Sequence, residues 1–219
     1  MSLKYDQHLN LADDDAFLLR RFMNSCGHIY TALIQYFKSF PEFSYLSFHS
    51  KKSLIKNNLN QIFRLNSALV IKATGSVDDR DFPFFRRIFP PDLFTDLHKC
   101  VTALLPFLHD PILLKLILII LMFSTHLSLR YEYQANEFED TGSTAQIFHA
   151  QNIYVELLWR YILSRGSNSR QAIRLFSSFI SCLVYSQTVS MKLQEYIFRT
   201  ISNQTDQFVP IVQVMWSND

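Results

Sequence analysis

The chain has 219 residues, of which 48% are hydrophobic and 18% charged, and its net charge is +2. This length suits one domain with a core large enough to fold without disulfides or metals. The charge is too small to predict a nucleic-acid surface. With 20 Phe and 10 Tyr beside only 4 Gly, the composition favours a helical fold over a sandwich or a Rossmann fold, which need glycine in their turns and loops.

The sequence lacks the motifs of the common enzymes and metal proteins. Its three cysteines are far apart and form no Cys-x-x-Cys pair, which argues against a disulfide framework and a cysteine-rich zinc site and indicates a reducing compartment. It contains no His-x-x-x-His pair, no Gly-x-Ser-x-Gly and no glycine-rich phosphate loop. No catalytic site, cofactor or metal is therefore predicted, and the chain is not expected to be an enzyme.

The first half of the chain predicts two long helices. Apolar residues recur at three- and four-residue steps from Phe17 to Phe37, behind an acidic start and before Pro41. A second helix is expected after a cap at Ser50 and continues to about Leu69. The following segment, 72–91, reads as a loop with a short β-hairpin around 70–77. Residues 1–12 carry no signal-like core and are expected to be unstructured or foreign to the natural chain.

The second half predicts four more helices, over 92–108, 111–127, 144–163 and 169–202, the last one broken near Ser186. A polar interval, 132–143, separates the second and third of these. The most apolar run, 112–123, is too short for a membrane span of about 20 residues and contains Lys115, so it predicts a buried core helix. The expected architecture is all-α, with one domain over 1–219.

One stretch resembles the signature of the nuclear-receptor ligand-binding domain. That signature is an aromatic, a small residue and Lys, then Pro-x-Phe-x-x-Leu, then Asp-Gln-x-x-Leu-Leu-Lys. Seven positions match it in register without a gap: Lys38, Pro41, Phe43, Leu46, Leu54, Ile55 and Lys56. Downstream, 110–117, 151–161 and Arg170–Phe198 are similar to the family's eighth, ninth and dimerisation helices. Ser50-Lys51 replaces the Asp-Gln pair and Gln61 the buried glutamate, so an unrelated helical bundle that presents the motif stays an alternative.

The resemblance implies a three-layer antiparallel helical sandwich with an apolar cavity in its lower half. Transferred position by position, the ligand-binding walls are Phe22, Met23, Cys26, Ile29, Leu59, Phe63, Ser67, Val70 and Tyr196. Many relatives carry an arginine at the Val70 position, whereas only Cys26, Ser67 and Tyr196 are polar here. The expected ligand is therefore strongly apolar, a lipid or other small molecule. Bulky side chains that fill the cavity are the alternative.

The resemblance also implies a surface groove for an amphipathic L-x-x-L-L helix of a coregulator. The groove positions are Ile34, Lys38, Phe43, Lys52, Ile55, Lys56 and Gln213. Lys38 is expected to cap the carbonyls at the C-terminal end of the bound helix. Gln213, in the tail segment 211–215, stands where the family has a glutamate that caps the other end, and Lys52 stands where an apolar residue is usual. Weakened ligand-dependent activation is therefore expected.

These observations together predict the ligand-binding, regulatory domain of a nuclear-receptor-type transcription factor. Its expected partners are an apolar small molecule, a coregulator helix and a second subunit, which docks along Arg170–Phe198 to form a homodimer or a heterodimer. DNA is expected to be bound only through a separate domain outside 1–219, and no membrane partner is predicted. The expected location is nuclear, with the cytoplasm as a possible additional location. The alternative function is a ligand-independent scaffold of the same fold with a filled pocket, acting as a corepressor or dimerisation partner.

Overall fold

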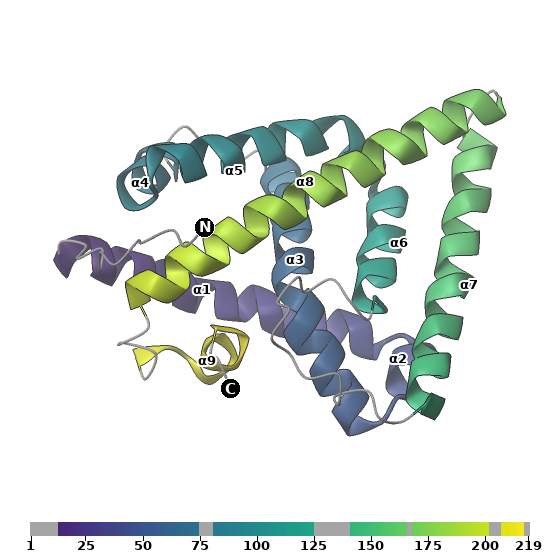
Figure 1. The fold of residues 1–219 in the computed structure, drawn as a ribbon, viewed down its shortest axis with the longest axis horizontal. Coiled ribbons are helices and arrows are strands. Elements are labelled where there is room, and N and C mark those ends of the chain that lie inside the picture. The colour runs from purple at the N-terminus through teal and green to yellow at the C-terminus, as the bar shows by residue number, and fades with distance from the viewer. Residues whose placement is uncertain (1–12, 75–80, 125–140, 166–167, 202–206, 217–219) are drawn as a thin grey trace, which may run out of the picture.

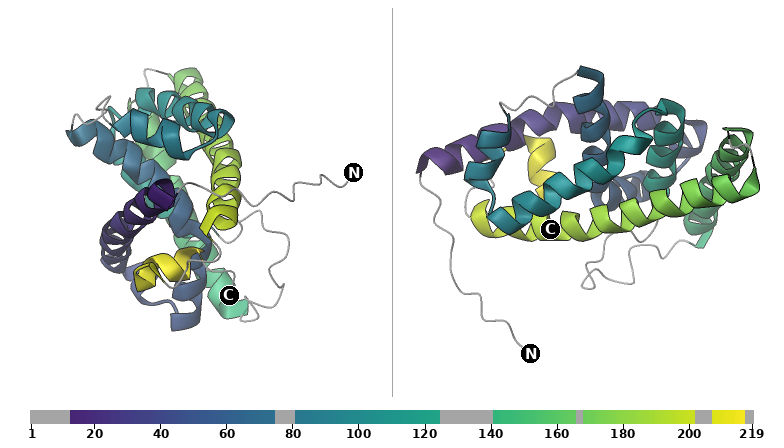
Figure 2. Two further views of the ribbon diagram at one scale, coloured as in Figure 1. Left: turned by 90° about the vertical axis from the view of Figure 1, so that its left-hand side faces the viewer. Right: turned by 90° about the horizontal axis from the view of Figure 1, so that it is seen from above.

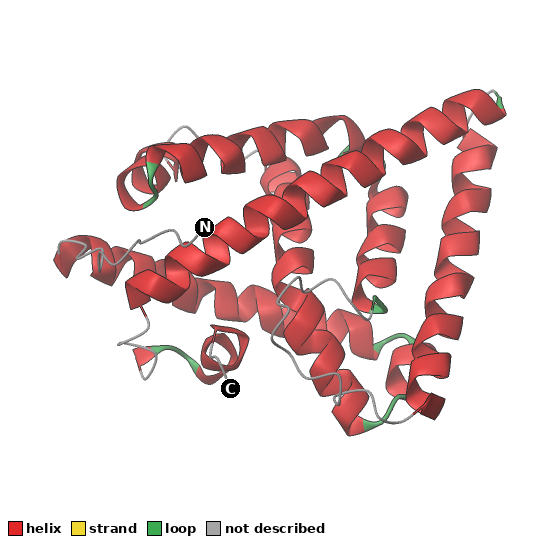
Figure 3. Cartoon of the chain, in the orientation of Figure 1, coloured by secondary structure: helices red, strands yellow, loops and turns green. Residues whose placement is uncertain are grey.

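The computed structural model describes residues 13–74, 81–124, 141–165, 168–201 and 207–216. Across these residues every regular element is a helix and no strand occurs; Figure 3 shows red helices joined by green loops and no yellow strand. The predicted all-α fold is confirmed.

The N-terminal third contains α1 (Asp13–Lys38), the single turn α2 (Pro41–Ser44) and α3 (Phe48–Thr74). The apolar spacing of α1 is reflected in its buried residues, which follow one another at three- and four-residue steps. Helix α3 begins two residues before the expected cap. The Ser47 hydroxyl oxygen accepts the backbone N–H of Ser50 at 3.1 Å, so Ser47 caps the helix and Ser50 lies inside its first turn.

The region around residues 70–91 differs from the prediction. Helix α3 continues to Thr74 and α4 spans Asp81–Ile88, so the hairpin is wrong over 70–74 and the predicted loop contains a helix. Pro83 falls in the first turn of α4, where a missing N–H costs nothing. Phe85, Ile88 and Phe89 then pack against the hydrophobic core. The remaining hairpin residues, 75–77, lie outside the described residues.

The middle of the chain forms α5 (Pro91–Leu104), the 3-10 turn η1 (Leu105–Phe107) and α6 (Pro111–Met122). Helix α6 is the apolar run, and most of its side chains are buried, which confirms the predicted core helix. The Asp110 carboxylate caps its start by accepting the Leu113 N–H at 3.1 Å. At its end, Asn58 of α3 donates to the carbonyls of Met122 and Ser124 at 2.9 and 2.7 Å, which pairs groups that a helix end leaves free.

The C-terminal half forms α7 (Thr141–Arg165), α8 (Ser169–Ile201) and α9 (Pro210–Trp216). Most of the polar interval 132–143 lies outside the described residues. Helix α8 is continuous, so the predicted break near Ser186 is wrong. Ser186 is buried, and its carbonyl accepts the Ser190 hydroxyl at 2.6 Å within the helix. By length and composition alone, the span Ser169–Thr200 of α8 could cross a membrane, and 22% of its apolar window is buried. Buried core helices of soluble proteins pass the same test of length and composition.

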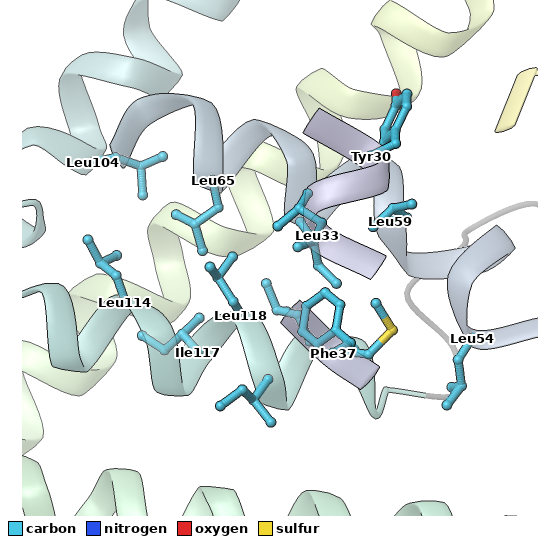
Figure 4. Packing of buried hydrophobic residues seen from close by; sticks show 14 of the residues in the cluster. Tyr30, Leu33, Phe37, Leu54, Leu59, Leu65, Leu104, Leu114, Ile117 and Leu118 are labelled. Carbon is cyan, nitrogen blue, oxygen red and sulfur yellow. The ribbon is translucent and has the colours of Figure 1, made fainter. Parts of the chain in front are cut away.

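Helix α3 lies at the centre of the arrangement (Figure 1). It contacts α1, α6, α8 and α9, and α1 and α8 lie on opposite sides of it (Figure 2, left). Side chains from α1, α3 and α6 meet in the core, as Figure 4 shows for Phe37, Leu59 and Leu118. Helix α3 therefore lies between α1 and α8, and α9 packs against α1 and α3.

Candidate functional site

The C-terminal helix α9 is packed closely on α1 and α3. Gly27 makes this possible, because a Cβ atom there would lie 2.9 Å from Cγ2 of Val209 and 3.3 Å from Cγ2 of Ile211. Val212 and Met215 are buried in the same contact. The C-terminal segment therefore packs against α1 at Gly27, where the absence of a side chain permits the close approach.

Two asparagine side chains hold the ends of this segment. Asn24 of α1 accepts the Val209 N–H at 2.9 Å, just before α9 begins. Asn60 of α3 donates to the Met215 carbonyl at 3.2 Å, in the last turn of α9. Because one partner is on α1 and the other on α3, the position of α9 depends on both helices.

A buried polar network connects α9 with the interior through Tyr30. The Tyr30 hydroxyl donates to Oδ1 of Asn60 at 2.7 Å and accepts Nε1–H of Trp216 at 3.3 Å. Burial raises the pKa of Tyr30 far above its usual value, so the hydroxyl keeps its proton in this network. The Tyr30 ring also packs on Phe63, with the ring centroids 5.0 Å apart. A change at Phe63 would thus reach Trp216 through a single residue.

Most of the predicted ligand-binding positions face the interior. Met23, Cys26 and Leu59 are buried, and Phe22, Ile29 and Phe63 are partly buried and pack against the core. Ser67 and Val70 continue α3, but their side chains lie outside the described part of the structure. Burial raises the pKa of the Cys26 thiol to about 12, so it stays protonated. The lining of a cavity by these residues stays a prediction.

The predicted positions Phe22 and Tyr196 are joined by a row of aromatic rings across α4. The centroid distances are 5.3 Å from Phe22 to Phe85, 5.8 Å from Phe85 to Phe89 and 5.7 Å from Phe89 to Tyr196. The Tyr196 hydroxyl donates to the Ile88 carbonyl, so its proton is already used and it would meet a ligand only as an acceptor.

The predicted groove positions are divided between surface and core. Lys38 and Lys52 are exposed, Ile34 and Ile55 are partly buried, and Lys56 is partly buried and engaged in a contact. Phe43 is fully buried against Phe37 and Phe123, so it supports the surface from below. The Gln213 side-chain amide donates to the Phe208 carbonyl at 2.8 Å and is thus held within its own segment.

The structure adds surface aromatics that the sequence did not single out. Phe48 and Tyr45 are 83% and 85% exposed, next to the end of α1 where the Ser44 hydroxyl donates to the Lys38 carbonyl at 2.8 Å. Phe48, Lys52 and Ile55 follow one another at four- and three-residue steps, so they share one side of α3. Phe48 therefore supplies an apolar surface beside Lys52, where the groove had been expected to lack one.

Comparison with models of known protein families finds no match to the chain, and comparison with curated proteins also finds none. Within the described residues, no three His, Cys, Asp or Glu side chains gather in a way that could hold a metal ion. The functional interpretation therefore depends on the geometry of α9, the interior behind it and the surface beside Lys38.

Proposed function

We propose that the chain is a nuclear-receptor-type ligand-binding domain, a regulatory module that binds a small molecule inside and a coregulator helix on its surface. The observation that carries this proposal is the packing of α9 on α1 and α3 at the sequence position expected for an activation helix. The order of the helices and the placement of α3 between α1 and α8 support it. Nuclear location and DNA contact through a separate domain are parts of the same proposal.

In this proposal a coregulator helix docks beside Lys38. The Lys38 ammonium, in the last turn of α1, would face the helix carbonyls, which carry partial negative charge. Phe48 and Ile55 would contact its leucines. At the other end, Gln213 offers a neutral amide in place of a carboxylate, and charge-assisted hydrogen bonds are roughly twice as strong as neutral ones. Ligand-dependent activation is accordingly weakened.

Coupling between the two sites would pass through Tyr30. A ligand that presses on Phe63 moves the Tyr30 ring, and the Tyr30 hydroxyl binds both Asn60 and Trp216. The ligand shifts α9 only to the extent that it binds one arrangement of this network better than the other. The interior ligand and the coregulator helix would thus both act on the equilibrium between the arrangements of this buried network.

Helix α8 would provide the contact with a second subunit, and we propose that this subunit is a second copy of the chain. Ile173, Ile180, Val184 and Met191 are all exposed, at 54%, 40%, 56% and 43%. They are seven, four and seven positions apart, which places them on one line along the helix, as in a coiled-coil seam. A two-fold axis pairs such a line with itself. The low burial of the apolar window of α8, 22%, leaves this surface free for a partner.

One observation favours the alternative of a ligand-independent scaffold. The rings of Phe22, Phe85, Phe89 and Tyr196 occupy the space between α1, α4 and α8, where part of a ligand would otherwise lie. A chain with a filled interior would still expose Lys38, Phe48 and the line of apolar residues along α8. It would then act as a corepressor or a dimerisation partner without a small molecule.

Fluorescence anisotropy with a labelled L-x-x-L-L peptide tests the coregulator site. The wild type should bind weakly, Lys38→Ala should bind about tenfold more weakly, and Gln213→Glu about tenfold more tightly, since a charge-assisted bond is removed or added. Lys115→Ala, which removes an exposed lysine on α6, is the matched control and should behave as the wild type. Equal affinities for all four proteins would overturn the proposed clamp.

A further inference from the structure

Arg64 of α3 is a charged side chain without a visible counter-charge. Its Nε atom is buried and makes no hydrogen bond. The groups that act on its charge are the Tyr30 hydroxyl on α1 and the Cys100 thiol on α5. Burial raises the pKa of both groups, so neither carries negative charge at neutral pH. Among the described residues no carboxylate balances the guanidinium.

The Nε atom of Arg64 is buried, whereas the side chain as a whole keeps some accessible surface. The Arg64 side chain is only partly buried by its exposed area, yet burial lowers its pKa from 12.5 to about 10. The lowered pKa accords with the burial of the Nε atom, which water does not reach. With a pKa of about 10 the group still carries its charge at neutral pH. Enclosing an uncompensated charge is costly, and a fold tolerates it where an anion completes the site.

A second unpartnered donor lies one turn away on the same helix. Gln61 precedes Arg64 by three positions, so the two side chains leave the same side of α3. The Nε2 atom of Gln61 is buried and makes no hydrogen bond. Two enclosed donors without acceptors on one helix face are the complement of a small oxyanion.

We propose that Arg64, with Gln61 beside it, binds the carboxylate head of an amphipathic ligand in the interior between α1, α3 and α5. This inference rests on the proposed function, because it names the ligand class of that same interior site. It also changes the expected ligand: the binding positions predicted from the sequence included no cation, so the ligand expected there was strongly apolar. The single positive charge of Arg64 matches a singly charged carboxylate, and Phe63, Met23 and Leu59 would accommodate the apolar tail.

The test compares two probes with the same tail, oleate and oleyl alcohol, in displacing the neutral dye Nile red. The wild type should bind oleate about ten- to a hundredfold more tightly than the alcohol, because only the acid forms a charge-assisted bond. Arg64→Met should lose this preference, and Arg64→Lys, which keeps the charge without the planar fork, should retain part of it. Arg199→Met removes an exposed arginine of α8 and should leave the preference unchanged.

The outcomes separate this inference from the proposed function. Equal affinity of the wild type for acid and alcohol would overturn the carboxylate site and leave an apolar ligand site standing. An undiminished preference for oleate in Arg64→Met would likewise overturn the role of Arg64. Failure of Nile red to enter the wild type would overturn the interior ligand site itself, and the carboxylate site with it. The comparison of the two probes on the wild type needs no variant, so it holds even if Arg64→Met does not fold.

Discussion

The contact of Gly27 with the C-terminal segment gives the sharpest structural prediction. A Cβ atom at this position would lie 2.9, 3.3 and 3.5 Å from Cγ2 of Val209, Ile211 and Val212. These methyl groups belong to β-branched side chains, which are stiff at χ1, and all three belong to one segment. The Gly27→Ala methyl group can therefore be accommodated only if the segment as a whole moves outward.

The size of the effect follows from two opposing contributions. Replacing glycine by alanine within a helix stabilises the helix by about 0.8–1 kcal/mol. Relieving the 2.9 Å approach needs a movement of about half an ångström, and overpacking of this kind costs about 1–3 kcal/mol. The global free energy of unfolding should therefore change little, whereas the free energy that holds α9 on α1 should fall by about 1–3 kcal/mol.

Hydrogen exchange and tryptophan fluorescence distinguish these two effects. In a Trp159→Phe background Trp216 is the single tryptophan, since the chain has two. In that background Gly27→Ala should shift the Trp216 emission to longer wavelength and reduce amide protection over 208–216. His28→Ala, at an exposed neighbouring position of α1, should change neither. A Gly27→Ala protein with unchanged Trp216 emission and protection would refute the described packing of α9.

Two further variants test the interior and the outer helix. Phe63→Ala should lower the free energy of unfolding by about 3 kcal/mol as a core truncation and raise Nile red uptake, because it opens space beside Tyr30; a stability loss with unchanged dye uptake would favour the filled scaffold. Val184→Glu places a charge in the apolar line of α8, so it should convert a dimer into a monomer of 25.7 kDa in light-scattering chromatography. Ser178 is exposed on another side of α8, so the control Ser178→Glu should leave the dimer intact. A dimer that withstands Val184→Glu would exclude this line as the interface.

The long helices were predictable because their apolar residues repeat with the helical period. The repeat in α1 was visible from Phe17 to Phe37, and the run 112–123 indicated a buried helix. Helix α4 was missed because Pro83 among charged residues resembles a loop, although proline is well tolerated in a first turn. Helix α2 was missed because four residues contain no period to detect.

The contacts that define the site could not be predicted from the sequence. Asn24 and Asn60 bind backbone groups more than 150 positions away, and local spacing carries no information about such partners. A charged residue such as Arg64 in a helical pattern normally indicates a solvent-facing side, and only the fold shows that its Nε atom is buried. The close packing at Gly27 was detectable in the sequence, because a glycine inside a helical pattern costs stability and often marks close packing.

Native mass spectrometry of the purified chain tests the central claim, that this fold is a receptor for a small molecule, most directly. The receptor account predicts a species heavier than 25.7 kDa by the mass of one amphipathic ligand, which denaturing solvent releases and which identifies itself by fragmentation. Phe63→Ala should retain or increase the fraction of this species. A wild-type chain that carries only its own mass, and that remains so after incubation with oleate and oleyl alcohol, would contradict the receptor account and favour the scaffold.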